Sequence, residues 1–365
     1  MPHTPITFKK AGKTASNRLV LAPMTNVQSN VDGSLGEDEY QWLISRARAG
    51  FGTIITCAAH VTEDGQGWQG ELGIFNDRLL PGLTRLSKGI RDAGSLAIVQ
   101  LYHGGMRAPE DVTGKQPFSA SAQAIKKRDG SEMLIREATT EDIQRVITAF
   151  GEAAQRAYKA GFDGVELHGA HGYLLSQFLS TVYNQREDAW GGSMEKRFRF
   201  ILSCLSAVRR NVPESFIVGV RISPESRGFA EGIDLNESLA LTHYLSHSGA
   251  DYIHVSIWDA FKKADHDPEG PTIIEHFRDV IPKDVVMMVA GELRTKADLT
   301  RAMDEGADML AIGKAAIGDT DWPEKVRSED YVPAPPPYTE EHLKKQHLGP
   351  AFIEYMKRWP GFVSV

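Results

Sequence analysis

Short runs of consecutive apolar residues recur along the chain, and segments of helical periodicity lie between them. Continuous hydrophobicity is typical of strands that are covered on both faces, as in a parallel sheet. Eight runs predict such strands, at residues 19–23, 53–58, 96–101, 165–168, 216–222, 252–257, 285–290 and 309–312. Helices are expected between them, for example at residues 140–160, 196–211, 236–248 and 296–304. The pattern therefore indicates alternating β and α units.

Glycines that recur just before the apolar runs support this alternation. Gly50, Gly94, Gly161, Gly249 and Gly306 each stand shortly before an apolar run. A glycine in that place can take the left-handed conformation that ends a helix and turns the chain back. Repeated helix–glycine–strand units predict a single-domain (β/α)8 TIM barrel, a fold whose size range includes 365 residues. A doubly wound open sheet is the alternative, although no GxGxxG motif follows the first strand.

Two segments depart from the pattern. Residues 104–138, after the third strand, are polar and weakly periodic, so we expect a long loop with a small hairpin. Long loops of this kind often cover the site of a barrel. Residues 1–330 form the expected barrel, and residues 331–365 form a C-terminal extension that begins with a proline-rich connector. We expect the extension to pack on the barrel or on a neighbouring subunit and to bury Trp359 and Phe362.

The composition excludes several classes of protein. The formal net charge of −7 offers no general attraction for nucleic acid or acidic lipid. Cys57 and Cys204 are the only cysteines, which excludes a disulfide scaffold and a four-cysteine metal or iron–sulfur site within this chain. No apolar run reaches the ~20 residues that a membrane span needs, and the first residues lack the apolar core of a signal peptide. A cytoplasmic protein without membrane or nucleic-acid partners is expected.

Polar and small residues follow several of the expected strands, where TIM barrels place their chemistry. They are Met24, Thr25, Ala58, Gln100, Tyr102, His168, His171, Tyr173, Arg221, Gly291, Gly313 and Lys314. An amide, a guanidinium and two glycine turns facing one pocket suit a flat heterocycle that carries a phosphate, since loops after strands seven and eight are the usual phosphate site. Arg221 could instead form a structural ion pair with Glu166 or Asp251.

The cluster of His168, His171 and Tyr173 has three open interpretations. If the chain turns helically after the strand, the two imidazoles lie three residues apart on one face. They could be structural, could bind a metal, or could donate hydrogen bonds to a substrate oxygen with Tyr173 as the acid. A zinc site needs three or four ligands, so a metal-dependent barrel hydrolase would have to add His60 and His103.

Longer motifs add a family resemblance. The segments NRLVLAPMT, QLYHGG, HGAHGYLLSQFLS, NQREDAWGGS, VGVRIS and AIGKA resemble those of the old yellow enzyme family of FMN-dependent NAD(P)H:flavin oxidoreductases, or ene-reductases. The resemblance runs from about residue 17 to residue 322. It implies a TIM barrel that holds FMN non-covalently and uses NADH or NADPH to reduce small activated alkenes, namely enones, enals, nitroalkenes and maleimides. It implies no metal.

The same resemblance implies FMN contacts for a set of matching residues. They are Pro23, Met24, Thr25, Ala58, Gln100, Arg221, Gly291, Gly313 and Lys314. Thr25 would lie near the C4 carbonyl and N5 of the flavin, Gln100 at its pyrimidine edge, and Arg221 at N1 and the C2 carbonyl. Gly291, Gly313 and Lys314 match the phosphate turns.

Substrate roles follow from the resemblance in the same way. His168 and His171 match the pair that binds the electron-withdrawing oxygen of the substrate, and Tyr173 matches the proton donor. Tyr102 falls where the family often has an aromatic residue of the substrate pocket. A non-catalytic flavin carrier is a further alternative, but it leaves the two imidazoles and the phenol without a purpose.

Some positions depart from the family pattern. Lys314 stands where the family usually has arginine, and it offers a point charge rather than a bidentate fork. Glu292 follows Gly291, so we expect its carboxylate to point away from the phosphate. Some members insert a C-terminal arginine into a neighbouring active site, and Arg358 is the candidate here. The apolar tail favours contact with a second copy of the chain.

Overall fold

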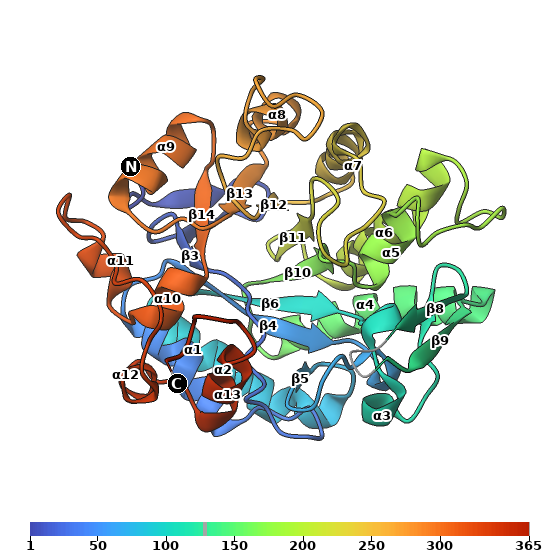
Figure 1. The fold of residues 1–365 in the computed structure, drawn as a ribbon, viewed down its shortest axis with the longest axis horizontal. Helices are drawn as coiled ribbons and strands as arrows, with labels where there is room; N and C mark the ends of the chain where they lie inside the picture. The colour runs from blue at the N-terminus through green and yellow to red at the C-terminus, as the bar shows by residue number, and fades with distance from the viewer. Residues whose placement is uncertain (127–129, 365) are drawn as a thin grey trace.

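The computed structural model describes residues 1–126 and 130–364. Eight parallel strands form a closed barrel in the order β3, β14, β13, β12, β11, β10, β6 and β4, with β3 paired again to β4 (Figure 1). These strands are β3 (Leu19–Leu21), β4 (Thr53–His60), β6 (Leu96–Tyr102), β10 (Gly164–Gly169), β11 (Ile217–Ile222), β12 (Tyr252–Ser256), β13 (Val286–Ala290) and β14 (Met309–Ile312). Each overlaps one of the expected runs, so the prediction of a (β/α)8 TIM barrel is confirmed.

Helices lie outside the barrel and alternate with its strands (Figure 1). They include α1 (Glu37–Arg48), α2 (Leu80–Asp92), α4 (Thr140–Lys159), α6 (Met194–Asn211), α7 (Leu235–His247), α8 (Ile273–Val280), α9 (Lys296–Asp304) and α10 (Lys314–Gly318). Thr139, Thr272 and Thr295 begin α4, α8 and α9 with capping boxes, which satisfy N–H groups that a helix start leaves free. All five glycines of the sequence signal have positive φ, from 83° to 120°, as the prediction requires.

One end of the barrel is filled and closed. The strands β1 (Ile6–Phe8) and β2 (Lys13–Ala15) form an antiparallel hairpin, and Phe8 packs against Tyr252 inside the barrel with ring centroids 5.8 Å apart. A Cβ at Gly219 would lie 2.0 Å from the Tyr252 ring, so only glycine fits beside this aromatic layer. The opposite end, where the strands finish, is left for a ligand.

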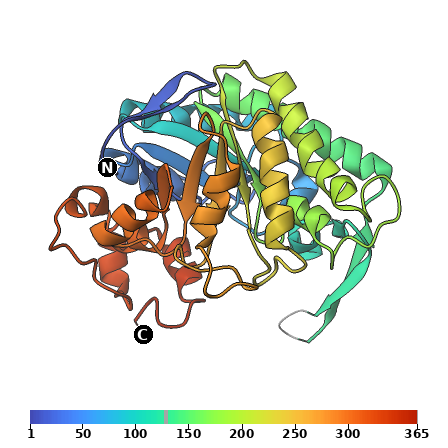
Figure 2. The ribbon, with the colours of Figure 1, turned by 90° about the horizontal axis from the view of Figure 1, so that it is seen from above.

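The long loop after β6 contains the expected hairpin. In this loop α3 (Glu110–Thr113) and β7 (Phe118–Ser119) precede β8 (Gln123–Lys126), which pairs antiparallel with β9 (Glu132–Glu137). The hairpin prediction is confirmed, and residues 127–129 of the loop lie outside the described residues. Figure 2 shows this hairpin and the C-terminal extension toward one end of the barrel, with the β1–β2 hairpin at the other.

The C-terminal extension packs on α1 and α10. After α11 (Trp322–Lys325) it forms α12 (Glu340–Lys345) and α13 (Pro350–Met356). The fully buried guanidinium of Arg46, on α1, donates from Nη2 to the carbonyl of Ala316 at 2.9 Å and from Nη1 to the carbonyl of Gln346 at 2.6 Å. Phe362 is buried as expected, whereas 47% of the surface of Trp359 is exposed in the single chain, so burial of Trp359 against a neighbouring subunit stays a prediction.

Short elements complete the described fold. They are η1 (Glu63–Gly65), β5 (Leu72–Gly73), η2 (Asp77–Leu79), η3 (Gly105–Arg107) and α5 (Leu174–Leu179). Among the described residues, none of the helices combines the length and the apolar character that crossing a bilayer requires.

Candidate active site

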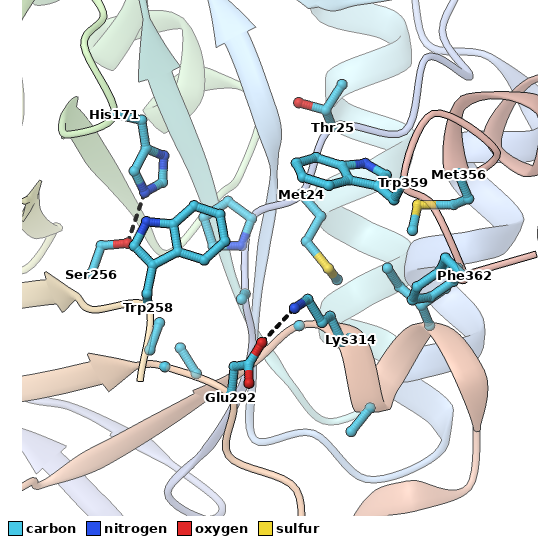
Figure 3. A pocket seen from close by; sticks show the side chains of 18 of the residues that line it. Met24, Thr25, His171, Ser256, Trp258, Glu292, Lys314, Met356, Trp359 and Phe362 are labelled. Atoms are coloured by element: carbon cyan, nitrogen blue, oxygen red, sulfur yellow. Dashed lines mark hydrogen bonds and ion pairs between the residues drawn. The ribbon is translucent and has the colours of Figure 1, made fainter. Parts of the chain in front are cut away.

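A cavity of about 540 Å³ opens at the carboxyl ends of the barrel strands, a volume within the usual range for small-molecule sites. It gathers the expected site residues Pro23, Met24, Thr25, Ala58, Gln100, His168, His171, Tyr173, Arg221, Gly291, Gly313 and Lys314. These residues come from segments far apart in the sequence, and the barrel alone brings them together. The C-terminal extension adds Met356, Trp359 and Phe362 to the wall (Figure 3).

One wall carries the two imidazoles and the phenol. The ring of His168 has its centroid 5.0 Å from that of His171 and 5.0 Å from that of Tyr173. The expected helical turn is wrong: His168 belongs to β10, and His171 has a φ of 61°, in the left-handed region. The helix α5 begins only after Tyr173. A tight turn, rather than helical spacing, therefore brings the three side chains together.

The environment keeps all three groups neutral near pH 7. Burial lowers the pKa of His168 well below 6.5, and His171 and Arg221 add to this effect. Burial, Arg221 and Arg107 lower the pKa of His171 well below the same value. Burial raises the pKa of Tyr173 above 10, against the opposing effect of the Arg107 cation. Each group can therefore donate a hydrogen bond without carrying charge.

Ser256, at the end of β12, links the imidazole wall to Arg221. Its Oγ accepts from Arg221 Nη2 at 3.0 Å and lies 2.8 Å from His171 Nε2 (Figure 3). Because the hydroxyl accepts from the guanidinium, its own proton is free to point at Nε2. The hydroxyl also has a second acceptor site, so it can pair with either tautomer of neutral His171. The sequence analysis missed Ser256, although the rule that polar residues follow barrel strands could have found it.

Arg221 forms neither of the structural ion pairs considered from sequence. Asp251 pairs with Arg209 instead. The Glu166 carboxylate accepts from Gln100 Nε2 at 2.7 Å and lies 2.8 Å from His254 Nδ1. Against the effect of burial, His254 and Arg221 hold the pKa of Glu166 below its usual value, so the carboxylate is ionised.

Arg221 and Gln100 both line the cavity, and each keeps hydrogen-bonding capacity that the described part of the protein does not use. Arg221 Nε is buried and has no hydrogen-bond partner among the described residues. With the amide nitrogen of Gln100 engaged by Glu166, its oxygen is the atom left for a ligand N–H. A buried guanidinium is stable only with electron-rich partners. The site therefore calls for a ligand with acceptors next to an N–H group.

Charged residues surround the far end of the cavity, where Gly291 and Gly313 end β13 and β14. Lys314 Nζ lies 2.5 Å from Glu292 Oε1, and both side chains are about half exposed (Figure 3). The Glu292 carboxylate therefore pairs with the lysine on the cavity wall, and its expected direction away from a bound phosphate stays a prediction. Arg294 also lines this end, and no acidic partner for it is found in the described part of the chain.

If the cavity holds FMN, as the family resemblance implies, replacing Glu292 with glutamine is expected to tighten FMN binding about two- to fivefold. The change removes a negative charge next to the phosphate end, and exposed pairs of this kind are worth only a fraction of a kcal/mol to about 1 kcal/mol. The dissociation constant can be measured from the quenching of FMN fluorescence. The gain should shrink as salt is added. Lys314→Gln is the matched variant and should weaken binding, so weaker binding by Glu292→Gln would contradict this assignment.

Tyr102 is placed differently from the other site residues. Its side chain is fully buried, and it packs edge-on against Tyr173 with ring centroids 4.6 Å apart. Trp68 covers it from another side at 5.7 Å, and Trp68 itself lines the cavity. Tyr102 thus supports the wall from behind, and its substrate contact stays a prediction.

The histidines needed for a metal site are not gathered. His60 stacks on Phe75, and His103 packs near Asp64 and Phe118, away from the cavity. Within the described ranges there is no group of three or more His, Cys, Asp or Glu side chains arranged to hold a metal ion. The hydrolase alternative therefore lacks the ligand set on which it depends.

The donors of the cavity fit FMN. The free oxygen of Gln100 and the guanidinium of Arg221 suit the N–H and carbonyl groups of a flavin pyrimidine ring, and Lys314 with the glycine turns suits its phosphate. Neutral imidazoles and a phenol beside such a ring suit a redox reaction rather than a hydrolysis. The fold and the site define an FMN-dependent barrel oxidoreductase.

Comparisons with known proteins agree. Residues 3–332 match the model of the NADH:flavin oxidoreductase / NADH oxidase family. The chain is 36% identical to the probable NADH-dependent flavin oxidoreductase YqiG of Bacillus subtilis over 329 residues, which cover 88% of this chain and 87% of that protein. It is 37% identical to the NADH:fumarate oxidoreductase of Klebsiella pneumoniae, over 86% of this chain but only 35% of that protein.

Solved structures give the same result. The old yellow enzyme homologue from Zymomonas mobilis superposes with a TM-score of 0.79 at 27% identity, covering 91% of this chain and 93% of that one. Morphinone reductase, solved with tetrahydroNAD, gives a TM-score of 0.78 at 29% identity, covering 97% and 96%. The chain belongs to the NADH:flavin oxidoreductase / NADH oxidase family and is of the old yellow enzyme type, with FMN and a nicotinamide nucleotide as its cofactors.

Proposed function

We propose that the enzyme reduces the C=C bond of small alkenes conjugated to a carbonyl or nitro group, including enones, enals, nitroalkenes and maleimides, with NADH or NADPH as reductant. The observation that carries the proposal is the wall of two neutral imidazoles and a neutral phenol in one cavity with the flavin-binding groups. A flavin carrier would not need these donors.

FMN, when bound, supplies the hydride chemistry, taking a hydride from the nicotinamide and passing one to the β-carbon of the alkene. His168 and His171 donate hydrogen bonds to the oxygen of the activating group, where negative charge develops in the transition state. Tyr173 gives its Oη proton to the α-carbon and regains a proton from solvent. Arg221 lines the cavity and would hold positive charge beside the pyrimidine ring of FMN, where it would stabilise negative charge. Thr25 also lines the cavity, and its hydroxyl would be available to hydrogen-bond the flavin.

An anaerobic titration tests the function as a whole. Purified yellow protein should lose its visible absorbance on addition of NADH or NADPH, and cyclohex-2-enone should then restore it without oxygen. The saturated ketone is the expected product. Protein that is bleached by the nicotinamide but recovers only with oxygen would contradict alkene reduction and favour an oxidase or a carrier.

Removing both imidazoles should weaken the binding of phenol-like ligands about 100-fold while the yellow colour remains. A phenolate oxygen takes the place of the substrate oxygen, and each hydrogen bond to a charged atom contributes roughly 1.5 kcal/mol. The variant is His168→Ala with His171→Ala, and the measurement is the spectral titration of the bound flavin with a para-substituted phenol. His243→Ala, on the outer helix α7, is the control. Unchanged phenol affinity would remove the oxygen-binding role from both histidines.

A further inference from the structure

Arg107, in η3 after β6, forms the middle layer of a three-residue stack. Its guanidinium carbon lies 4.3 Å from the centroid of the Tyr173 ring and 4.4 Å from that of Phe229. Both distances are well within the ~6 Å range of cation–π attraction. The three residues come from the loops that follow β6, β10 and β11. The side chain of Arg107 therefore contacts both the ring of the proposed proton donor and the ring of Phe229.

A hydrogen bond ties the same guanidinium to the imidazole turn. Arg107 Nη1 donates to the carbonyl of His171 at 2.8 Å, and the N–H of His171 donates to Ser223 Oγ at 3.0 Å. His171 holds a left-handed φ that a residue with a side chain rarely adopts, so its backbone needs such support from both sides. The turn also needs Gly172, where a Cβ would lie 1.9 Å from the Phe229 carbonyl oxygen.

The charge of Arg107 is not cancelled by an ion pair. Within residues 1–126 and 130–364, no carboxylate lies within salt-bridge distance of its guanidinium, whose ordered neighbours are the two rings and a carbonyl. The cation therefore acts on the phenol beneath it, and it lowers the pKa of Tyr173 against the effect of burial. When Tyr173 has given its proton to the α-carbon, the remaining phenolate lies directly under this cation.

We propose that Arg107 is a positioning residue that fixes the Tyr173 ring for proton transfer and stabilises the phenolate left behind. The role rests on the proton-donor function proposed above. Arg107 does not line the cavity, so it acts through Tyr173 rather than on substrate or flavin. Its effect should be confined to the half-reaction in which the alkene is reduced.

The experiment uses the FMN-loaded protein and stopped-flow measurement of each half-reaction. Arg107→Met keeps the length of the side chain and removes its charge, and it should slow reoxidation by cyclohex-2-enone about tenfold or more. The rate of flavin reduction by nicotinamide and the FMN dissociation constant should stay within about twofold. Arg107→Lys keeps the charge but not the flat stacking surface, so it should recover part of the rate. A neutral enone is used so that no substrate carboxylate can contact the arginine directly.

A double-mutant cycle separates positioning from a general structural effect. If Arg107 acts through the phenol, Arg107→Met should cause little further loss in a Tyr173→Phe protein. Phe229→Leu removes the exposed aromatic ring that contacts Arg107, and it should slow reoxidation by a smaller factor. Arg85→Met is the matched control, because Arg85 stacks on Tyr40 at 3.8 Å outside the cavity.

The outcomes are distinguishable. Normal reoxidation of the Tyr173→Phe protein by the enone would remove the proton-donor role of Tyr173, on which the role of Arg107 rests. A parent protein that the enone does not reoxidise would defeat the proposed function itself. A slow Tyr173→Phe protein beside an unaffected Arg107→Met protein would overturn only the role of Arg107. Equal losses in both half-reactions, or a full further loss in the Tyr173→Phe background, would also overturn it. If Arg107→Met fails to fold, as judged by thermal unfolding, Arg107→Lys and Phe229→Leu carry the same test.

Discussion

Replacing Tyr173 with phenylalanine should slow the reduction of an enone by roughly 10²- to 10⁴-fold and leave flavin reduction by nicotinamide nearly unchanged. The change removes one hydroxyl and keeps the ring that packs between Arg107 and Tyr102. General acid catalysis by a positioned side chain contributes a factor of this size. Stopped-flow measurement of the two half-reactions gives both rates from the same protein. Equal losses in the two would count against proton donation by Tyr173.

Tyr102→Phe is the matched control for this experiment. The Tyr102 hydroxyl is buried and has no hydrogen-bond partner among the described residues, so its removal should cost the fold nothing. If Tyr102 only supports the wall, both half-reactions should keep their rates. A weaker affinity for enones in Tyr102→Phe would instead favour the substrate contact expected from sequence.

Replacing Arg221 with methionine should weaken FMN binding on the order of 100-fold, because truncating one partner of a buried charged contact is costly. The reduction potential of any flavin still bound should fall, since the positive charge beside the reduced ring is gone. Fluorescence titration gives the dissociation constant, and anaerobic dye equilibration gives the potential. FMN binding that survives Arg221→Met unchanged would separate Arg221 from the cofactor.

Two further measurements separate the charge of Arg221 from its planar shape, and its role in FMN binding from a structural role. Arg221→Lys keeps the charge and loses the planar fork, so its affinity should lie between those of the other two proteins. The flavin-free Arg221→Met protein should unfold at the same temperature as the flavin-free parent or above it, because a buried cation with an unpaired Nε has been removed. The stabilisation gained on adding FMN should be smaller than in the parent. A loss of stability without FMN would indicate a structural role.

The barrel could be predicted from sequence because its signals are local. Each strand is a short apolar run, and a glycine such as Gly161 or Gly249 marks the turn before it with a positive φ. The rule that barrel chemistry follows the strands then selects Gln100, Arg221 and Lys314 with no knowledge of contacts. These features need only a few neighbouring residues, so a linear pattern preserves them.

Other features depend on contacts between distant segments and escaped prediction. The direction of the Glu292 carboxylate is decided by Lys314, which begins α10 after the next strand of the barrel. The left-handed turn at His171 is held by Arg107 and Ser223, from two other loops. The position of Tyr102 behind Tyr173 follows from the edge-on packing of the two aromatic rings. The wall formed by the C-terminal extension has no local signal at all.

Hydrogen bonds from Arg46 connect the C-terminal extension to the turn that is expected to bind the FMN phosphate. The buried side chain of Arg46 donates hydrogen bonds to the carbonyl of Ala316, two residues after Lys314, and to the carbonyl of Gln346 in the extension. If FMN binding at the expected phosphate turn stabilises this contact, linkage requires that packing of the extension on α1 strengthens FMN binding by the same free energy. Residues 331–365 are then expected to contribute to the affinity for FMN.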